Sequence, residues 1–242
     1  MKIYKARDYD HLSQIAANII AAQITLKPES VLGLATGGTP VGTYKELIKK
    51  HKSGDLCFSE VKSINLDEYC TLAPESPQSY AYFMNDNLFN HVNIKAENVN
   101  IPSGLNLDAD AECKRYDEVI KKNPIDLQLL GLGPNGHIGF NEPDAELKLG
   151  TNHVSLAQAT IDANKRYFER EEDVPKTAYT MGMGSIMHSR KVLLIASGEG
   201  KAEILYKALK GPLTTQVPAS LLQLHRDLIV VGDEGSLKFL VR

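Results

Sequence analysis

The chain has 242 residues, of which 43% are hydrophobic and 24% charged, and its formal net charge at pH 7 is −3. This composition is typical of a globular α/β protein, and it excludes the strongly basic field that nucleic acid or an acidic membrane face would attract. No apolar run approaches the roughly 20 residues needed to span a bilayer, and the first residues lack the apolar core of a signal peptide. We therefore expect a cytoplasmic protein that binds neither membrane nor nucleic acid.

Short apolar runs alternate with longer stretches of helical periodicity. The expected strands, in chain order, are Ser30–Ala35, Lys62–Asp67, Val99–Pro102, Asp126–Gly133, Val192–Ser197 and Leu228–Gly232. The expected helices are His11–Leu26, Val41–His51, Ser79–His91, Ala109–Lys122, Lys201–Leu209 and Ala219–Leu224. This alternation predicts a mostly parallel sheet with helices on both faces, in which the first strand begins near residue 30 after a single helix.

We expect a single domain over residues 1–242, because no Pro/Ser-rich linker or charge block divides the chain. The alternation is interrupted by Pro134–Met187, a long interval that includes a helical stretch, Ala157–Phe168. Connections of this length are often lids or binding loops, which suggests a lid-like insertion at 151–180. On length alone, an ordinary helical excursion fits equally well.

Polar residues follow four of the expected strands directly. These four clusters are Thr36–Thr39, Asp67–Tyr69, Gly131–Pro143 and Gly198–Lys201. In an open parallel sheet all four would lie along the carboxyl edge, where ligands bind near a topological switch point. Their convergence is stronger evidence for a site than any one cluster.

The first cluster suits an anion such as phosphate. Gly37 and Gly38 let the backbone approach a ligand closely, while Thr36 and Thr39 add hydroxyls at a helix start whose N–H groups are free. A plain strand-to-helix turn would use the same residues. The run matches neither a Walker A loop nor G-x-G-x-x-G, so a nucleotide is disfavoured.

The third cluster is the most informative, since it holds four glycines and two prolines in thirteen residues. It places His137 near Asn135 and Glu142 in a glycine-rich turn whose backbone can approach a ligand closely. This combination favours a role in acid–base chemistry over a purely structural role. One histidine and one glutamate would leave a metal under-ligated, so we expect no metal.

Asp67 is a candidate base at a strand end, and Glu68 competes with it for that role. Lys201 and Arg166 could join in binding a phosphate, although for each a solvated surface charge is the default interpretation. A nucleophilic mechanism is poorly supported, because there is no Gly-x-Ser-x-Gly turn and no cysteine in these four clusters.

The runs Leu34–Pro40, Asn65–Tyr69 and Asn135–Pro143, in this order, resemble the glucosamine-6-phosphate deaminase family. The resemblance continues through Asn164–Phe168, Val174–Ala178, Gly200–Ala202 and Leu222–His225, so it covers essentially the whole chain. It implies a Rossmann-like sheet and conversion of glucosamine 6-phosphate and water into fructose 6-phosphate and ammonia, without a cofactor.

The same resemblance implies roles for individual residues. His137 would open the sugar ring, held by Asn135 and Glu142, and Asp67 would move the C2 proton towards C1. The phosphate would lie against Thr36, Gly37, Gly38, Thr39, Arg166 and Lys201.

Two departures from the family pattern matter. Many relatives carry aspartate where this chain has Asn135, so we expect Glu142 to supply most of the charge that stabilises a protonated His137. The chain also stops at Arg242, without the C-terminal extension of allosteric hexameric relatives, which predicts hyperbolic kinetics and a monomer or small homo-oligomer. A 6-phosphogluconolactonase-like hydrolase and a non-catalytic sugar-phosphate sensor are the alternatives, and a sensor should carry a DNA-binding helix-turn-helix.

Overall fold

The computed structural model describes residues 1–156, 158, 161, 168, 170 and 173–240. Within these residues, a seven-stranded sheet has the order β1-β10-β9-β6-β2-β3-β5, and its neighbouring strands pair in parallel. The strands are β1 (Lys2–Ala6), β2 (Val31–Leu34), β3 (Lys62–Asn65), β5 (Val99–Asn100), β6 (Leu127–Leu130), β9 (Val192–Ala196) and β10 (Leu228–Asp233). The expected mostly parallel α/β sheet is confirmed.

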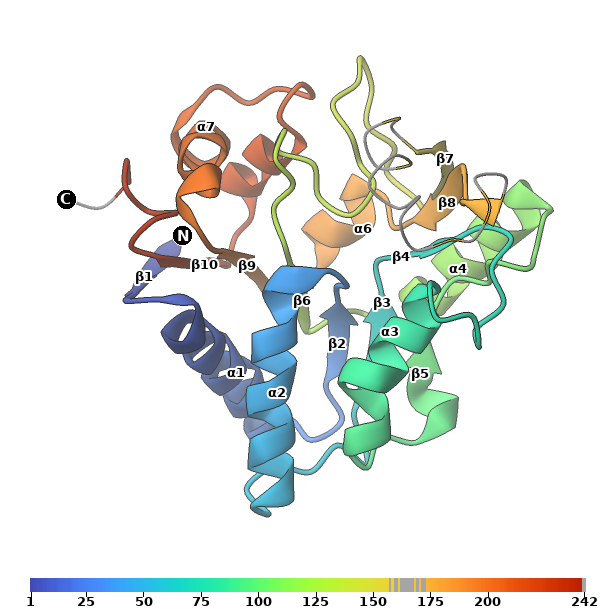
Figure 1. The fold of residues 1–242 in the computed structure, drawn as a ribbon, viewed down its shortest axis with the longest axis horizontal. Helices are drawn as coiled ribbons and strands as arrows, with labels where there is room; N and C mark the ends of the chain where they lie inside the picture. Colours follow the sequence, from blue (N-terminus) through green and yellow to red (C-terminus); the bar gives the residue numbers. More distant parts are fainter. Residues whose placement is uncertain (157, 159–160, 162–167, 169, 171–172, 241–242) are drawn as a thin grey trace.

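Helices cover both faces of this sheet (Figure 1). The α-helices are α1 (Tyr9–Leu26), α2 (Gly38–Lys52), α3 (Tyr80–Asn87), α4 (Ala109–Lys122), α6 (Met183–His188) and α7 (Ala202–Lys210). The 3-10 helices are η1 (Phe89–His91), η2 (Ala96–Asn98), η5 (Glu199–Lys201) and η6 (Pro218–Leu224).

Alternate side chains of each central strand enter two separate cores. In β9, Leu193 and Ile195 pack with residues of α1, α2 and α3, whereas Val192 and Leu194 pack with residues of α4, α6, α7 and η6. Because successive residues of a strand point to opposite faces, a strand that is buried on both sides must be apolar throughout. The continuous apolar runs of the sequence have this origin.

Helix α1 begins at a side-chain cap and presents one apolar stripe. The Asp8 carboxylate accepts a hydrogen bond of 2.7 Å from the backbone N–H of His11, which satisfies one free donor of the first turn. Leu12, Ala16 and Ile20, spaced four residues apart, are fully buried. The stripe fixes α1 against α2 and β10.

A second sheet stands beside the carboxyl edge of the first. It has three antiparallel strands in the order β4 (Asp67–Tyr69), β8 (Thr177–Thr180) and β7 (Asn152–Ser155). Leu66 alone separates β3 from β4, so the expected strand Lys62–Asp67 is in fact two strands in two sheets. Asp67 consequently begins the second sheet.

Several expectations need correction. The first strand is β1 at the N-terminus, not the strand near residue 30; it is an edge strand, and Ala6 is its one buried residue. Ser79–His91 divides into α3 and η1, and the expected helix Ala219–Leu224 is the 3-10 helix η6. Most of the expected helical stretch Ala157–Phe168 lies outside the described residues.

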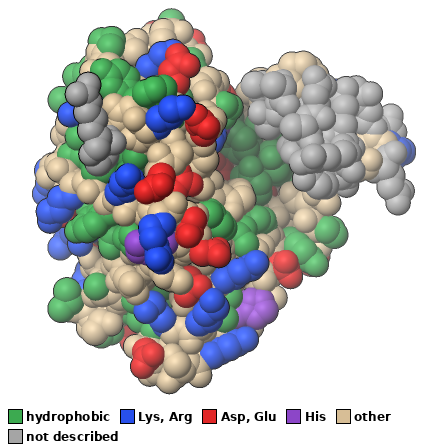
Figure 2. Space-filling model, turned by 60° about the vertical axis from the view of Figure 1, so that its left-hand side comes forward, with side chains coloured by type: hydrophobic (Ala, Val, Ile, Leu, Met, Phe, Trp, Pro, Cys, Tyr) green, Lys and Arg blue, Asp and Glu red, His purple; other side chains and the backbone are tan. Residues whose placement is uncertain are grey.

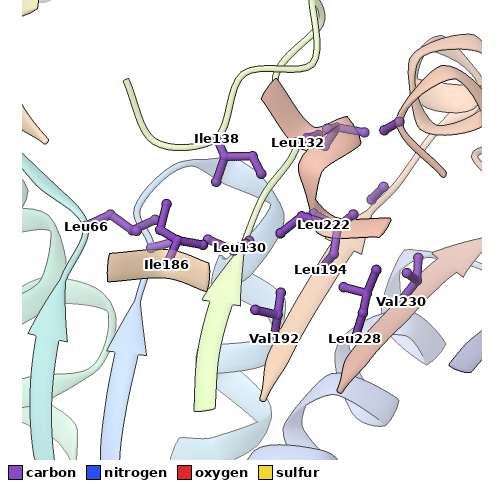
Figure 3. Packing of buried hydrophobic residues seen from close by; sticks show 14 of the residues in the cluster. Leu66, Leu130, Leu132, Ile138, Ile186, Val192, Leu194, Leu222, Leu228 and Val230 are labelled. Atoms are coloured by element: carbon purple, nitrogen blue, oxygen red, sulfur yellow. The ribbon is translucent and has the colours of Figure 1, made fainter. Parts of the chain in front are cut away.

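Residues adjacent to the candidate catalytic groups are anchored in the core. Leu66 precedes Asp67, and Ile138 follows His137; both are buried in the cluster that also contains Leu130 and Ile186 (Figure 3). Anchors of this kind hold the neighbouring polar side chains at fixed positions.

The surface of the described residues carries charges of both signs. Figure 2 shows lysine and arginine side chains interspersed with aspartate and glutamate on one face. None of the described helices is both long and apolar enough to cross a membrane.

Candidate active site

A cavity of about 290 Å³ opens at the carboxyl edge of the main sheet, where β9, β6, β2 and β3 are successive neighbours. Each of these four strands leads into one of the polar clusters found in the sequence. The expected site residues that line the cavity are Thr36, Gly37, Gly38, Thr39, Asp67, His137 and Lys201. Asn135 and Glu142 lie behind His137, and Arg166 lies outside the described residues.

The loop from β2 to α2 is shaped to expose backbone N–H groups. Gly37 has φ 99°, a conformation that favours glycine, and α2 begins at the next residue without a side-chain cap. Two tyrosine hydroxyls brace the loop from behind: that of Tyr44 donates to the carbonyl of Ala35 at 2.6 Å, and that of Tyr9 donates to the carbonyl of Gly38 at 3.0 Å. A rigid helix start with free N–H groups is an anion site.

Glycines hold the turn after β6 close to His137. A β-carbon on Gly133 would lie 2.2 Å from the imidazole ring, and Gly136 and Gly139 adopt φ values of 87° and 57°. The backbone N–H of Gly133 donates to the carbonyl of His137 at 3.0 Å, which closes the turn.

Asn141 ties this turn to the second sheet. Its buried side-chain amide donates 2.9 Å hydrogen bonds to the carbonyls of Ile138 and Met181, and Met181 directly follows β8. The backbone N–H of Phe140 also donates to the hydroxyl of Thr180 in β8 at 3.1 Å. Together these contacts fix the turn relative to the strand that pairs with β4.

His137, Glu142 and Asn135 form a connected group. Nδ1 of His137 lies 2.9 Å from Oε1 of Glu142, and Nδ2 of Asn135 donates to Oε2 of the same glutamate at 2.7 Å. Burial would raise the pKa of Glu142, but hydrogen bonding with His137 and Asn135 outweighs it and holds that pKa below its ordinary value. Glu142 is therefore the charged partner of the imidazole, and Asn135 orients Glu142 without contributing charge.

Asp67 also lines this cavity. The side chain is 5% exposed, and its backbone pairs with that of Thr180. Burial, assisted by the nearby charge of Glu68, raises the pKa of Asp67 from 3.8 to about 8. A buried carboxylate with such a pKa is a strong base for its type, which suits removal of a proton from carbon.

Glu68 points away from this cavity. Its carboxylate accepts hydrogen bonds from three backbone N–H groups and lines a separate cavity of about 490 Å³ on the opposite side of β4. Adjacent residues of a strand face opposite ways, so Asp67 and Glu68 cannot both address the same substrate. The geometry favours Asp67 over Glu68 as the base.

Aromatic rings complete the wall beside Asp67. Tyr80, from the first turn of α3, stacks on Phe140 with ring centroids 6.0 Å apart and an interplanar angle of 8°. Both rings line the cavity. Neither residue is among the site residues predicted from the sequence, although Phe140 lies within the glycine-rich turn that predicted the site.

Lys201 comes from η5, immediately after β9. Gly198 (φ 91°) starts this turn, and its N–H donates to the buried carboxylate of Asp233 at 2.8 Å. Burial lowers the pKa of Lys201. The side chain places an ammonium group at the cavity wall, where an anionic substrate would interact with it.

The described residues include no group of three or more histidine, cysteine, aspartate or glutamate side chains arranged to hold a metal ion. The arrangement provides a buried base, an imidazole with a charged partner, and an anion-binding loop with a lysine. It can therefore bind a phosphorylated substrate and move protons on it.

Comparison with known proteins gives a consistent picture. A family model described as glucosamine-6-phosphate isomerases/6-phosphogluconolactonase matches residues 6–230. The glucosamine-6-phosphate deaminase of Lachnoclostridium phytofermentans is 57% identical over 232 residues, which cover 96% of this chain and 98% of that protein. The glucosamine-6-phosphate deaminase of Clostridium perfringens (strain 13) is 52% identical over 241 residues, which cover 99% and 100% of the two chains.

Solved structures agree in fold. A monomeric glucosamine-6-phosphate deaminase superimposes with a TM-score of 0.93 at 46% identity, covering 98% of this chain and 99% of the other. A 6-phosphogluconolactonase from Leishmania guyanensis gives a TM-score of 0.76 at 18% identity over 100% and 99% of the two chains. The second likeness is one of fold alone.

Proposed function

Because the chain belongs to the family of glucosamine-6-phosphate isomerases and 6-phosphogluconolactonases, we propose that it is a glucosamine-6-phosphate deaminase. It converts glucosamine 6-phosphate and water into fructose 6-phosphate and ammonia. One observation carries the proposal: Asp67, from β4, and His137, from the turn after β6, line one cavity that also opens onto the β2–α2 loop.

The phosphate binds at the start of α2. The backbone N–H groups and hydroxyls of Thr36–Thr39 donate hydrogen bonds to the phosphate, and Lys201, which lines the same cavity, supplies a positive charge. Arg166, which lies outside the described residues, remains a candidate second cation from the family resemblance. Binding at this remote group positions the sugar carbons between Asp67 and His137.

Ring opening is assigned to His137. The imidazole accepts the proton of the anomeric hydroxyl O1 and donates it to the ring oxygen, which breaks the C1–O5 bond and leaves an aldehyde at C1. During this transfer the imidazole is briefly charged, and Glu142, 2.9 Å away, stabilises that form.

Isomerisation is assigned to Asp67. The carboxylate removes the proton from C2 while the 2-ammonium group of the substrate gives a proton to O1, and a neutral enolamine forms. Asp67 then returns its proton to C1, so that C2 and its nitrogen become a protonated imine. Water adds to this imine, and the C2–N bond breaks to release ammonia and leave the ketone of fructose 6-phosphate.

The decisive experiment measures both products. Purified protein is incubated with glucosamine 6-phosphate, and fructose 6-phosphate and free ammonia are quantified; we expect one of each per substrate consumed. The same protein is given 6-phosphogluconolactone as a control, with no acceleration of its hydrolysis expected. Lactone hydrolysis without ammonia release would replace the assignment with the lactonase alternative.

We further propose that the protein is a monomer or a small homo-oligomer, which the likeness to a monomeric deaminase supports. Sedimentation velocity at several protein concentrations tests it. A hexamer together with sigmoidal kinetics would contradict it.

A further inference from the structure

Glu68 is a buried carboxylate that the proposed reaction does not use. It is 2% exposed, and three backbone N–H groups donate to it, each at 2.8 Å. Two of the donors, Tyr80 and Ala81, are the first residues of α3, while the third, Tyr69, belongs to β4. One side chain thus joins the strand of the candidate base to the start of a helix.

Through its hydrogen bond to Tyr80, Glu68 contacts a residue that forms one wall of the cavity. Tyr80 is fixed through its backbone by Glu68, and its ring packs beside those of Tyr69 and Phe140, with centroids 4.6 Å and 6.0 Å away. A negative charge at the N-terminus of α3 also interacts favourably with the helix dipole. Glu68 therefore determines where the aromatic side of the cavity stands relative to Asp67.

The charged forms of Glu68 and Asp67 are stabilised to different extents. Burial raises the pKa of Glu68 to about 7, but three N–H donors stabilise its charged form and limit this rise, whereas no hydrogen bond to the Asp67 carboxylate is found among the described residues. When two buried carboxyl groups interact, the better-solvated one ionises first and disfavours ionisation of the other. The charge of Glu68 accordingly raises the pKa of Asp67, in addition to the larger effect of burial.

Other groups also face Asp67 and must be included in any pH argument. Among the described residues they are the hydroxyls of Tyr80 from α3 and Tyr116 from α4, both in electrostatic contact with Asp67, and His137 and Lys201 across the cavity. Burial raises the pKa values of both tyrosines well above their ordinary value, so they stay neutral over the working range. Glu68 is the negative charge nearest in sequence to Asp67.

We propose that Glu68 is a positioning residue of the reaction: it holds the first turn of α3, and with it Tyr80, against β4, next to the carboxylate of Asp67. This inference rests on the proposed deaminase function. It predicts two separable effects of Glu68, one on the alignment of the cavity wall and one on the protonation of Asp67.

The first test compares pH profiles of kcat/KM. In Glu68→Gln the acidic-side midpoint is expected to move to lower pH by about one unit, the order found for interacting buried carboxylates. The maximal kcat is expected to fall about tenfold, because the amide cannot accept from all three N–H groups and Asp67 becomes a weaker base. KM should change less than kcat, since Glu68 reaches the phosphate loop only through Tyr80, whose hydroxyl interacts with the side chain of Thr36.

Two variants serve as controls. Glu75→Gln removes the same charge from an exposed position on the connection between β4 and α3, and it should match wild type. Glu68→Asp keeps the charge but shortens the side chain; its midpoint should lie near that of wild type while its kcat stays low. An unshifted midpoint in Glu68→Gln, or a Glu68→Asp midpoint equal to that of Glu68→Gln, overturns the inference.

A second test needs no turnover and no change at Glu68. Carboxyl ¹³C NMR titration follows Glu68 in wild type and in Asp67→Asn. We expect the Glu68 resonance to respond to two titration steps in wild type and to the first of these alone in the variant, because asparagine matches the protonated aspartate. Identical Glu68 titrations in the two proteins overturn the inference, whereas absence of ammonia release by wild type would overturn the proposed function alone.

Discussion

Gly133 and His137 fix each other's position, because a β-carbon on the glycine would lie 2.2 Å from Nε2 of the imidazole. The ring occupies the space that any other residue at position 133 would fill. We expect Gly133→Ala to displace the ring and to reduce kcat about 100-fold, the cost typical of a misplaced catalytic group. Steady-state kinetics measures this loss. Gly200→Ala is the matched control, since a β-carbon there meets nothing within 4 Å and Gly200 does not line the cavity; an equal loss in both variants would contradict the explanation.

Glu142→Gln should reduce kcat about 100-fold, within the range typical of acid–base catalysis. The amide keeps the shape of the side chain but removes the charge that stabilises a protonated His137, and Asn135 cannot replace that charge. The rate is measured across the pH range, together with that of Glu146→Gln, whose side chain is 80% exposed. A Glu142→Gln profile identical to that of wild type in rate and shape would show that Glu142 does not support the imidazole.

Asp67→Asn should abolish turnover and stabilise the protein. The pKa of Asp67 is 3.8 in the unfolded chain and about 8 in the fold, so the folded protein binds this proton more tightly. Its contribution to stability is therefore fully present below about pH 4 and is lost as pH rises through about 8. Asparagine has no proton to lose, so the melting temperature of the variant should exceed that of wild type by a margin that grows between about pH 5 and pH 8.

Calorimetry at several pH values checks this margin. Asp86→Asn, at an exposed position of α3, is the control and should show no such growth. A margin that stays constant with pH would mean that Asp67 does not titrate differently in the folded and unfolded protein. For the active enzyme, the same pKa predicts that kcat/KM rises with pH towards about 8.

Lys201→Ala should act mainly on substrate binding. Loss of a charged contact to the phosphate typically costs about 1.5–3 kcal/mol, which corresponds to a KM increase of roughly 10- to 100-fold. The change in kcat should be smaller, because Lys201 does not reach the reacting carbons in the proposed scheme. Lys207→Ala, an exposed lysine of α7 paired with Glu203, is the control. A fall in kcat at constant KM would assign Lys201 to the chemical steps instead.

Local patterns in the sequence predicted most of the helices that cover the seven-stranded sheet. The helix expected at Ala109–Lys122 is α4 residue for residue, because Asp108 caps its start and an amphipathic pattern runs to its end. The four polar clusters also predicted the cavity, since parallel strands bring their carboxyl ends to one edge.

The second sheet could not be predicted in the same way. Its strands are short, and Asp67 pairs with Thr180, a partner that no local pattern identifies. Lys62–Asp67 was predicted as one strand because no glycine or proline marks the point, at Leu66, where the chain passes from the first sheet to the second. β1 was missed because an edge strand with one buried residue lacks a clear apolar run. Tyr80 could not be predicted because its position depends on a hydrogen bond from its backbone N–H to the carboxylate of Glu68, twelve residues away in the chain.

The amide of Asn141 has a consequence for redesign. Since it links the His137 turn to the end of β8, and β8 pairs with the strand that carries Asp67, the two proton-transferring groups belong to one braced frame. Enlarging the cavity for bulkier sugars by shifting β8 would disturb both groups at once. Substitutions that accept a larger substrate while keeping the catalytic spacing should instead be sought at the ring of Phe140, which lines the cavity, because the hydrogen bond of Phe140 to β8 is made by its backbone N–H and survives a change of side chain.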